Sequence, residues 1–402
     1  MLHFSTAMIL ILLGGIVVVS YLFSIISNYL KIPSVLLLLA AGIVVRAIAD
    51  AQGWALPIPA EAVEFLGVIG TIMIVLEAGL DLKLDREKTR LISSAFFSAF
   101  FILILCMAAV SAVLYYWLHE SVRSCIVYSI PLSIMSSSIV LPSLHHLTER
   151  KKEFLVYEAS FSDILGILLF NYFTGVEIVS ASAVGGFFLN ILIAVIFSII
   201  FSVLLCIILT KTVMNVKFFL VFALLIILYE TGKLINLPSL ITILVFGLLM
   251  KNWHLIRLPK VNRLFPANKV NEATHLLHSI TAESSFLVRT FFFLIFGYSI
   301  NLSAIAANVI AIGSVIVIIL FLIRFLYLRF FIKESVYPEV FFIPRGLITI
   351  MLFYKIPASY HPEKLQGGIL FFIVIVTGLI MMLGMMFYKK KEVEVVEDQV
   401  LK

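Results

Sequence analysis

Two stretches far apart in the chain share one pattern, and this pattern decides the fold. The first reads Ile32-Pro33-Ser34-Val35-Leu36 and continues to Gly42, and the second reads Leu237-Pro238-Ser239-Leu240-Ile241 and continues to Gly247. The spacing from proline to glycine is nine residues in both. The apolar segments that follow also match, because they end in Gly79-Leu80-Asp81-Leu82 and in Gly297-Tyr298-Ser299-Ile300-Asn301-Leu302. Two successive matches at one offset indicate an internal repeat.

The composition excludes most soluble classes of protein. Of the 402 residues, 62% are hydrophobic and 13% are charged, with a mean hydropathy of +1.15. Soluble domains are about 45–50% apolar and about 25% charged, so a soluble enzyme, a nucleic-acid-binding module and a disordered chain are not expected. The three cysteines, Cys106, Cys125 and Cys206, lie in apolar runs without CxxC spacing. No disulfide, metal centre or cofactor is therefore predicted from them.

Thirteen apolar segments are candidate membrane spans, since a helix crosses a bilayer with about 17–25 apolar residues. They cover residues 6–27, 33–48, 62–80, 91–118, 122–146, 152–173, 184–210, 216–233, 237–250, 274–300, 304–333, 337–357 and 366–388. The first span has no basic start and no cleavage signal, so we expect a retained helix and not a signal peptide.

The charges in the loops predict the orientation. The net charge is +6, from 29 Lys and Arg against 23 Asp and Glu. Of the 29 basic residues, 21 fall in the loops and tail of one side and 5 on the other side, while Arg289, Arg324 and Arg345 fall inside spans. Positive charge collects on the cytoplasmic side of membrane proteins. We therefore expect a multi-pass protein of the cell (inner) membrane, with the N-terminus outside and the C-terminus inside, and no nucleic-acid partner.

The matching segments lie seven spans apart, an odd number, so equivalent helices run in opposite directions. This is the inverted-repeat plan of secondary transporters. The predicted fold is an all-α polytopic membrane protein with about 13 transmembrane helices in two inverted six-helix repeats, about 1–173 and 216–388. Residues 1–388 are expected to form a single transmembrane transporter domain, followed by a short cytoplasmic tail at 389–402.

Two spans carry residues that interrupt a helix. The fifth contains Ser136-Ser137-Ser138-Ile139-Val140-Leu141-Pro142, and proline removes a backbone donor and clashes with the preceding turn. The twelfth contains Phe341-Phe342-Ile343-Pro344-Arg345-Gly346-Leu347, at the position that the repeat pairs with the fifth. Interrupted helices at corresponding positions of two halves point to a transporter's binding site. Discontinuous helices 5 and 12 are therefore predicted to cross near the midplane.

Asp163 is the clearest candidate for function, because it lies about half-way along the sixth span, in Glu158-Ala159-Ser160-Phe161-Ser162-Asp163. A charge at the bilayer centre costs at least about 2.5–3.5 kcal/mol. Glu158 and Ser162 are four residues apart and Ser160 and Asp163 are three apart, so one turn of helix presents two carboxyls and two hydroxyls. Arg345 cannot lose its proton, and Glu158 is its predicted partner.

Other charged residues receive weaker predictions. Glu77 and Asp81 lie at the inner end of the third span and are predicted to line the cytoplasmic mouth. Arg324 is expected to be structural or to reach toward an interface. Arg289 is expected to pair with Glu283.

These features together resemble the monovalent cation:proton antiporters, with NhaP-type sodium/proton exchangers as the closest branch. The resemblance rests on the thirteen spans, the repeat, Glu158-x-x-x-Ser162-Asp163 and Pro344-Arg345-Gly346. It implies that Asp163 binds both the cation, as its Na⁺ ligand, and the proton, with Ser162, Ser136 and Ser137 beside it. It also implies that Glu158 and Arg345 form a structural pair, that the chain works as a homodimer, and that it serves pH homeostasis.

Two departures from the family pattern leave the transported cation open. Ser162 stands where NhaP-type proteins have Asn or Asp, and Ser136-Ser137-Ser138 stands where they have Thr-Asp-Pro. The serine-rich version resembles the potassium-efflux branch, so K⁺/H⁺ exchange is the alternative to exchange of Na⁺ or Li⁺ for H⁺. With one carboxylate at the site, cation and proton compete for it and each neutralises it, while desolvation disfavours the empty anion. The predicted exchange by alternating access is therefore electroneutral.

Readings from other classes fit less well. An intramembrane aspartyl protease needs two facing Asp residues that share a proton, and Asp163 is the only Asp placed mid-membrane, so the chain is not expected to be an enzyme. An organic-anion symporter of similar fold would need more polar and basic lining than Arg345 provides. A channel or a non-transporting sensor is the remaining alternative. A channel would show single-channel currents, and a sensor would need a partner domain.

Overall fold

The computed structural model describes residues 6–30, 32–53, 60–85, 87–175, 181–211, 217–234, 239–255, 267–300, 307–332, 336–360 and 368–388. All regular structure within these residues is helical, which confirms the predicted all-α class. The predicted tail at 389–402 lies outside the described residues.

The observed helices lie on the predicted spans. The long ones are α1 (Thr6–Leu30), α2 (Ser34–Ala51), α3 (Ala60–Asp81), α4 (Thr89–Leu118), α7 (Glu149–Thr174), α8 (Ala181–Lys211), α9 (Lys217–Leu234), α10 (Ser239–Lys251), α12 (Ala267–Ser299), α13 (Ala307–Tyr327) and α15 (Gly368–Phe387). Two spans are divided into short elements: α5 (Val122–Ser133), α6 (Ser137–Val140) and η1 (Leu141–His146), and then η5 (Glu339–Phe341) and α14 (Leu347–Tyr354). Six segments within the described residues meet a strict length and hydropathy requirement for crossing a membrane.

The outer surface of the bundle is apolar, as a membrane requires. Ile11 on α1, Phe97 on α4 and Ile200 on α8 are exposed, at 75%, 52% and 64% of their surface. In water such a surface would drive aggregation, whereas lipid tails are as apolar as these side chains. The protein is therefore a multi-pass membrane protein, and its outward-facing apolar side chains are suited to contact with lipid.

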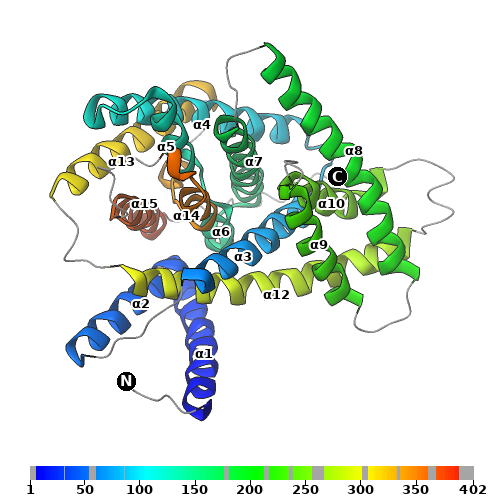
Figure 1. Cartoon of the computed structure of the whole chain (residues 1–402), viewed down its shortest axis with the longest axis horizontal. Helices are drawn as coiled ribbons and strands as arrows, with labels where there is room; N and C mark the ends of the chain where they lie inside the picture. The colour runs from blue at the N-terminus through cyan, green and yellow to red at the C-terminus, as the bar shows by residue number, and fades with distance from the viewer. Residues whose placement is uncertain are drawn as a thin grey trace, which may run out of the picture.

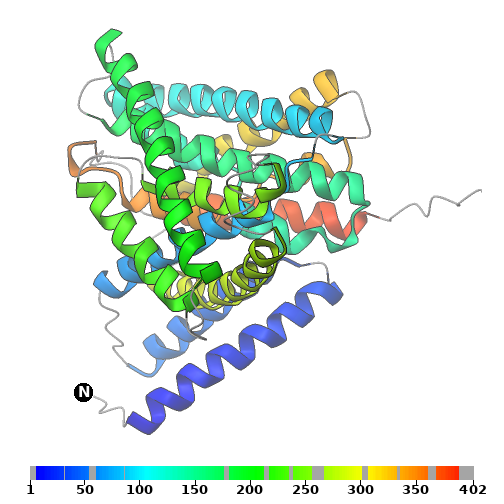
Figure 2. The same cartoon turned by 90° about the vertical axis from the view of Figure 1, so that its right-hand side faces the viewer.

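The helices pack into two groups that contact one another at few places. We call the first the α3 group, and it comprises α1, α2, α3, α8, α9, α10 and α12; the second is the α7 group, and it comprises α4, α5, α6, α7, α13, α14 and α15. Each group packs extensively within itself, and the main contacts between groups are α14 with α3 and α15 with α2. In Figure 2, α1 (dark blue) and α4 (cyan) lie at opposite edges of the molecule. Figure 1 shows α3 running between the groups, beside α14 and α6.

Glycine lets two helix pairs of the α3 group approach closely. A Cβ on Gly42 of α2 would lie 2.2 Å from the Leu294 carbonyl oxygen and 3.0 Å from Gly297 of α12. A Cβ on Gly247 of α10 would lie 3.0 Å from Gly79 of α3. These four glycines are the residues that the predicted repeat makes equivalent. The repeat stays a prediction, and the two equivalent contacts support it.

Candidate functional site

The two interrupted segments meet at the centre of the α7 group. Helix α5 ends at Ser133, Ile134–Ser136 are extended, and α6 begins at Ser137. In the other half, 342–346 are non-helical between η5 and α14. The backbone N–H of Ser136 donates to the carbonyl oxygen of Pro344, at 3.0 Å. The predicted interruptions are therefore present, and they contact each other directly.

The position of the first interruption differs from the sequence prediction. The prediction placed the unwinding at the serines and Pro142, but Pro142 lies at the start of the 3₁₀ turn η1, and the extended residues come earlier. Pro131 lies inside α5, three residues before Ile134. A Cβ on Gly346 would lie 2.4 Å from the Ser136 hydroxyl oxygen and 2.9 Å from the Ser136 Cβ. This glycine therefore leaves room for the Ser136 side chain at the crossing.

Asp163 lies beside this crossing and is almost completely buried, with 3% of its surface exposed. The backbone N–H of Ser137 donates to its Oδ2 atom at 3.1 Å, while its Oδ1 atom has no hydrogen-bond partner. Within the described part of the chain, no Lys, Arg or His forms an ion pair with it. A buried carboxylate with one free oxygen and no fixed counter-charge is suited to hold a mobile cation or a proton.

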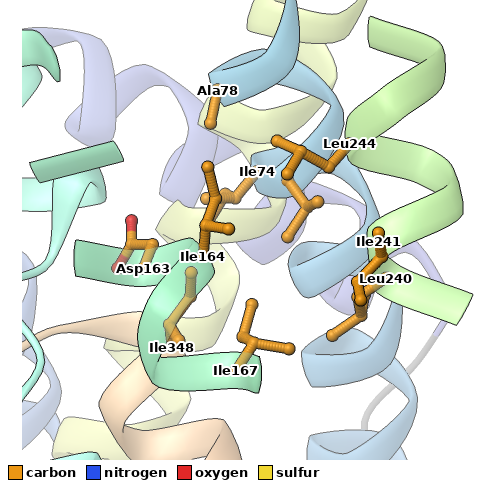
Figure 3. A pocket seen from close by; sticks show the side chains of 10 residues that line it. Ile74, Ala78, Asp163, Ile164, Ile167, Leu240, Ile241, Leu244 and Ile348 are labelled. Atoms are coloured by element: carbon orange, nitrogen blue, oxygen red, sulfur yellow. The ribbon is translucent and has the colours of Figure 1, made fainter. Parts of the chain in front are cut away.

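Apolar side chains close the space between Asp163 and the α3 group. A cavity of only about 10 Å³ remains there. Figure 3 shows Ile74 and Ala78 from α3, Leu240 and Leu244 from α10, and Ile164, Ile167 and Ile348 from the α7 group; the Asp163 carboxylate points away from Leu240. The carboxylate is thus kept from bulk water by apolar packing between the two groups.

The three predicted serines gather around the interruption, each with its own contacts. The hydroxyl of Ser162 accepts a hydrogen bond from the N–H of Met135 at 2.9 Å, so it ties α7 to the extended segment. The hydroxyls of Ser136 and Ser138 lie 2.8 Å apart. Ser137 reaches Asp163 through its backbone. These three serines and Ser138 are all buried. The role of Ser162, Ser136 and Ser137 as cation ligands stays a prediction.

The predicted pairing of Glu158 with Arg345 is wrong, because Glu158 pairs with Arg324. The guanidinium of Arg324 donates to both carboxylate oxygens, at 3.1 and 2.8 Å. Ser98 of α4 donates to the same carboxylate at 2.6 Å. Arg324 also donates to the Glu339 carbonyl oxygen at 2.8 Å. Helix α13 packs beside α4 and brings Arg324 to Glu158, so Arg324 does not reach toward an interface.

Arg345 instead binds carbonyl oxygens that the interrupted helices leave free. It donates to Leu132 at 2.6 Å and to Ile343 at 2.9 Å. The last carbonyls of a helix lack an N–H partner within the helix, and Leu132 lies in the last turn of α5. Arg345 and Glu158 line the same small cavity, of about 10 Å³, without forming an ion pair. The criterion that singled out Arg345, a charge inside an apolar span, also applied to Arg324 and could have found it.

Glu77 and Asp81 both contact α12. Glu77 lies 3.5 Å from the Arg289 guanidinium, and Asp81 lies 2.6 Å from the His278 ring. Because Arg289 contacts Glu77, and Glu283 accepts a hydrogen bond from Tyr21, the predicted pairing of Arg289 with Glu283 is wrong.

Asp81 also lines an open, charged cavity of about 390 Å³. This charged cavity is bounded by the α3–α4 linker, by η1 and by the first turns of α7. Within it, Glu153 accepts a hydrogen bond from Lys88 and holds the pKa of that ammonium above its usual value. The predicted role of Asp81 at a mouth fits this position, whereas Glu77 does not line the cavity.

These features are those of a multi-pass helical membrane protein in which two interrupted helices cross beside a buried carboxylate without an ion-pair partner among the described residues. A family model described as "sodium/hydrogen exchanger, transmembrane" matches residues 15–387. The chain therefore belongs to the sodium/hydrogen exchanger family, a family of cation/proton antiporters and not of enzymes.

Solved structures show the same fold. The structure of the sodium proton antiporter MjNhaP1 from Methanocaldococcus jannaschii at pH 8 is 18% identical, with a TM-score of 0.69 over 95% of this chain and 98% of that one. An electron-microscopy structure of the same antiporter is 17% identical, with a TM-score of 0.66 over 95% of each chain. A search of curated protein sequences gives no match.

Proposed function

We propose that the protein exchanges one Na⁺ for one H⁺ across the cell membrane by alternating access, with Asp163 as the shared site. The single observation that carries this proposal is the state of Asp163. Its side chain is buried, and no described residue forms an ion pair with it or a hydrogen bond to its Oδ1 atom. Either a proton or a cation can neutralise it, but both cannot bind at once.

The electroneutral stoichiometry follows from the buried charges near the crossing. Glu158 and Arg324 neutralise each other through two hydrogen bonds. Arg345 keeps a constant charge because it stays protonated. Of the described charged residues in the two interrupted segments and on α7 beside them, Asp163 is then the one whose charge changes, so each cycle moves one cation against one proton. Desolvation holds back the empty carboxylate anion.

The test is cation-driven proton movement in proteoliposomes. Asp163→Asn keeps the shape of the side chain and removes the charge, so we expect exchange to fall to the level of empty liposomes. Asp50→Asn on α2 is the matched control, since Asp50 is exposed and forms an ion pair with Arg46 on its own helix, and it should exchange like the unchanged protein. Full activity in Asp163→Asn would refute the site. An effect of imposed voltage on the rate would refute electroneutral exchange.

K⁺/H⁺ exchange is the second candidate, favoured by the hydroxyl-rich crossing at Ser136 and Ser138. Competition among Na⁺, Li⁺ and K⁺ in the same liposomes separates the two candidates. An organic-anion symporter is disfavoured by the structure's contacts, because the Arg345 guanidinium is engaged by two carbonyl oxygens and the cavity beside it holds only about 10 Å³.

The cellular setting is part of the same proposal. The distribution of basic residues supports a cytoplasmic C-terminus and an outer N-terminus. The family resemblance supports a homodimer with a role in pH homeostasis. Crosslinking in native membranes, together with labelling of each predicted loop from one side, tests these points.

A further inference from the structure

One face of α7 connects the charged cavity with Asp163. Glu149, Glu153 and Val156 line the cavity, and Asp163 and Ile167 line the closed apolar site. Successive positions are three, four or seven residues apart, which places them on one side of a helix. Glu158 and Ser162 fall on the opposite side, where both have partners. Helix α7 therefore presents a paired face and a face that leads from the cavity to the site.

Ser160 occupies the middle of that second face. It follows Val156 by four residues and precedes Asp163 by three, so it stands between the cavity and the carboxylate. Its side chain is fully buried, with 0% exposed, and its hydroxyl oxygen has no hydrogen-bond partner. Buried hydroxyls are normally paired, and leaving one unpaired is costly. The sequence analysis placed Ser160 on the face of Asp163 but gave it no role.

We propose that Ser160 is a cation ligand, which binds the ion together with the Oδ1 atom of Asp163. This inference rests on the proposed function. Side chains three residues apart on a helix have Cβ atoms about 5–6 Å apart, so a cation between them can contact both oxygens. Small, hard cations prefer oxygen ligands such as carboxylates and hydroxyls. The two buried oxygen atoms without partners on this face are the two that the cation would satisfy.

The proposal assigns different tasks to the two serines of the motif. Ser162 uses its oxygen to accept from Met135 and so fixes the interrupted segment. Ser160 supplies a neutral oxygen to the ion and adds no charge, so it affects how tightly the cation binds and not how many protons are exchanged. It also gives the cation a first contact as it comes from the charged cavity.

The experiment compares Ser160→Ala and Ser160→Cys with the unchanged protein in proteoliposomes. The cysteine variant has nearly the shape of serine, but its sulfur is a poor ligand for a hard cation. We expect the KM for Na⁺ to rise roughly tenfold in both variants, the size of losing one contact to a charged group. The rate at saturating Na⁺ and its pH dependence should stay close to those of the unchanged protein. Ser202→Ala on α8, whose hydroxyl bonds its own helix at Ser198, is the matched control and should leave the KM unchanged.

A binding measurement independent of transport completes the test. Because a bound ligand stabilises the folded state, Na⁺ should raise the Tm of the detergent-solubilised protein, and should raise it less in Ser160→Cys than in Ser202→Ala. If the KM and the Na⁺-induced Tm shift of Ser160→Cys stay within twofold of the unchanged protein, while Asp163→Asn abolishes exchange, Ser160 is not a ligand and the proposed function stands. If the unchanged protein exchanges no cation for protons, the proposed function itself fails.

Discussion

At the scale of single residues, the buried charges differ in whether they have a partner. Glu158 and Arg324 are both about 98% or more buried and bind each other through two hydrogen bonds. Arg345 is held by carbonyl oxygens. Among the described residues Asp163 has no such partner, and this difference in local contacts supports the proposal that Glu158 is structural and Asp163 binds the ions.

The pairing of Glu158 with Arg324 predicts that a second substitution at Glu158 restores the stability lost on substitution of Arg324. Arg324→Met leaves a buried carboxylate unpaired, which should destabilise the protein by about 3–5 kcal/mol. Adding Glu158→Met should restore most of this stability, since a buried ion pair replaced by apolar side chains of similar volume is often neutral. The Tm in detergent, followed by loss of the size-exclusion peak, measures both effects.

Arg345 supplies the control for this pattern. Arg345→Met leaves the carbonyl oxygens of Leu132 and Ile343 without donors, and Glu158→Met should not repair that loss. Rescue of Arg345→Met by Glu158→Met, with no rescue of Arg324→Met, would mean that Glu158 pairs with Arg345 after all.

The sequence identifies the important residues of the site better than it identifies their partners. Asp163, Glu158 and Arg345 stand out because each is a charge in an apolar helix. Which arginine reaches Glu158 depends on how α13 packs beside α4, and no local pattern encodes that packing. Serine identity likewise does not say whether a hydroxyl bonds the backbone, as Ser162 does, or is left without a partner, as Ser160 is.

At the scale of helices, glycine contacts hold the α3 group together. Gly42→Ala would place a Cβ 2.2 Å from the Leu294 carbonyl oxygen, and backbone atoms cannot move aside as a side chain can. We expect the two helices to separate, with a loss of about 1–3 kcal/mol. Gly247→Ala, at the equivalent contact with Gly79, should behave in the same way.

Gly14 on α1 is the control for the glycine prediction, because a Cβ there meets nothing within 4 Å. Gly14→Ala should be neutral or stabilising, by up to about 1 kcal/mol from helix propensity. The three variants are compared by Tm in one detergent. Equal Tm values for Gly42→Ala and Gly14→Ala would show that close approach at Gly42 contributes little.

The helices themselves follow from the sequence, since each of the thirteen apolar segments lies on a helix of the structure. The length of an apolar segment, and the proline and glycine residues within it, can be read directly from that segment of the sequence. The exact residues at which a helix is interrupted cannot, because they depend on contacts with distant segments. Ile134–Ser136 are extended because the opposite segment offers the Pro344 carbonyl oxygen to Ser136, and that segment lies about 200 residues away in the chain.

At the scale of the whole molecule, the proposed exchange by alternating access would require the α3 and α7 groups to move relative to each other. A contact that forms in only one of the two conformations, inward-open or outward-open, would then stabilise that conformation relative to the other. Lys355, which follows α14, donates a hydrogen bond to the Tyr229 hydroxyl of α9 and lies 5.0 Å from the centre of its ring. This contact joins the two groups on the predicted outer side.

Loss of this contact should favour opening of the site toward the outside. A hydrogen bond to a charged group contributes about 1.5–3 kcal/mol, so Lys355→Met should raise the population of the outward-open state roughly tenfold or more.

The measurement uses Ile348→Cys, which lines the closed site beside Asp163, and an impermeant thiol reagent added to intact cells. The native cysteines are buried, which keeps background labelling low. Arg46→Met is the matched control, because Arg46 lies over the ring of Tyr298 within the α3 group alone. Labelling should quicken in Lys355→Met and not in Arg46→Met, and equal rates in the two would show that the Lys355 contact does not hold the outer side closed.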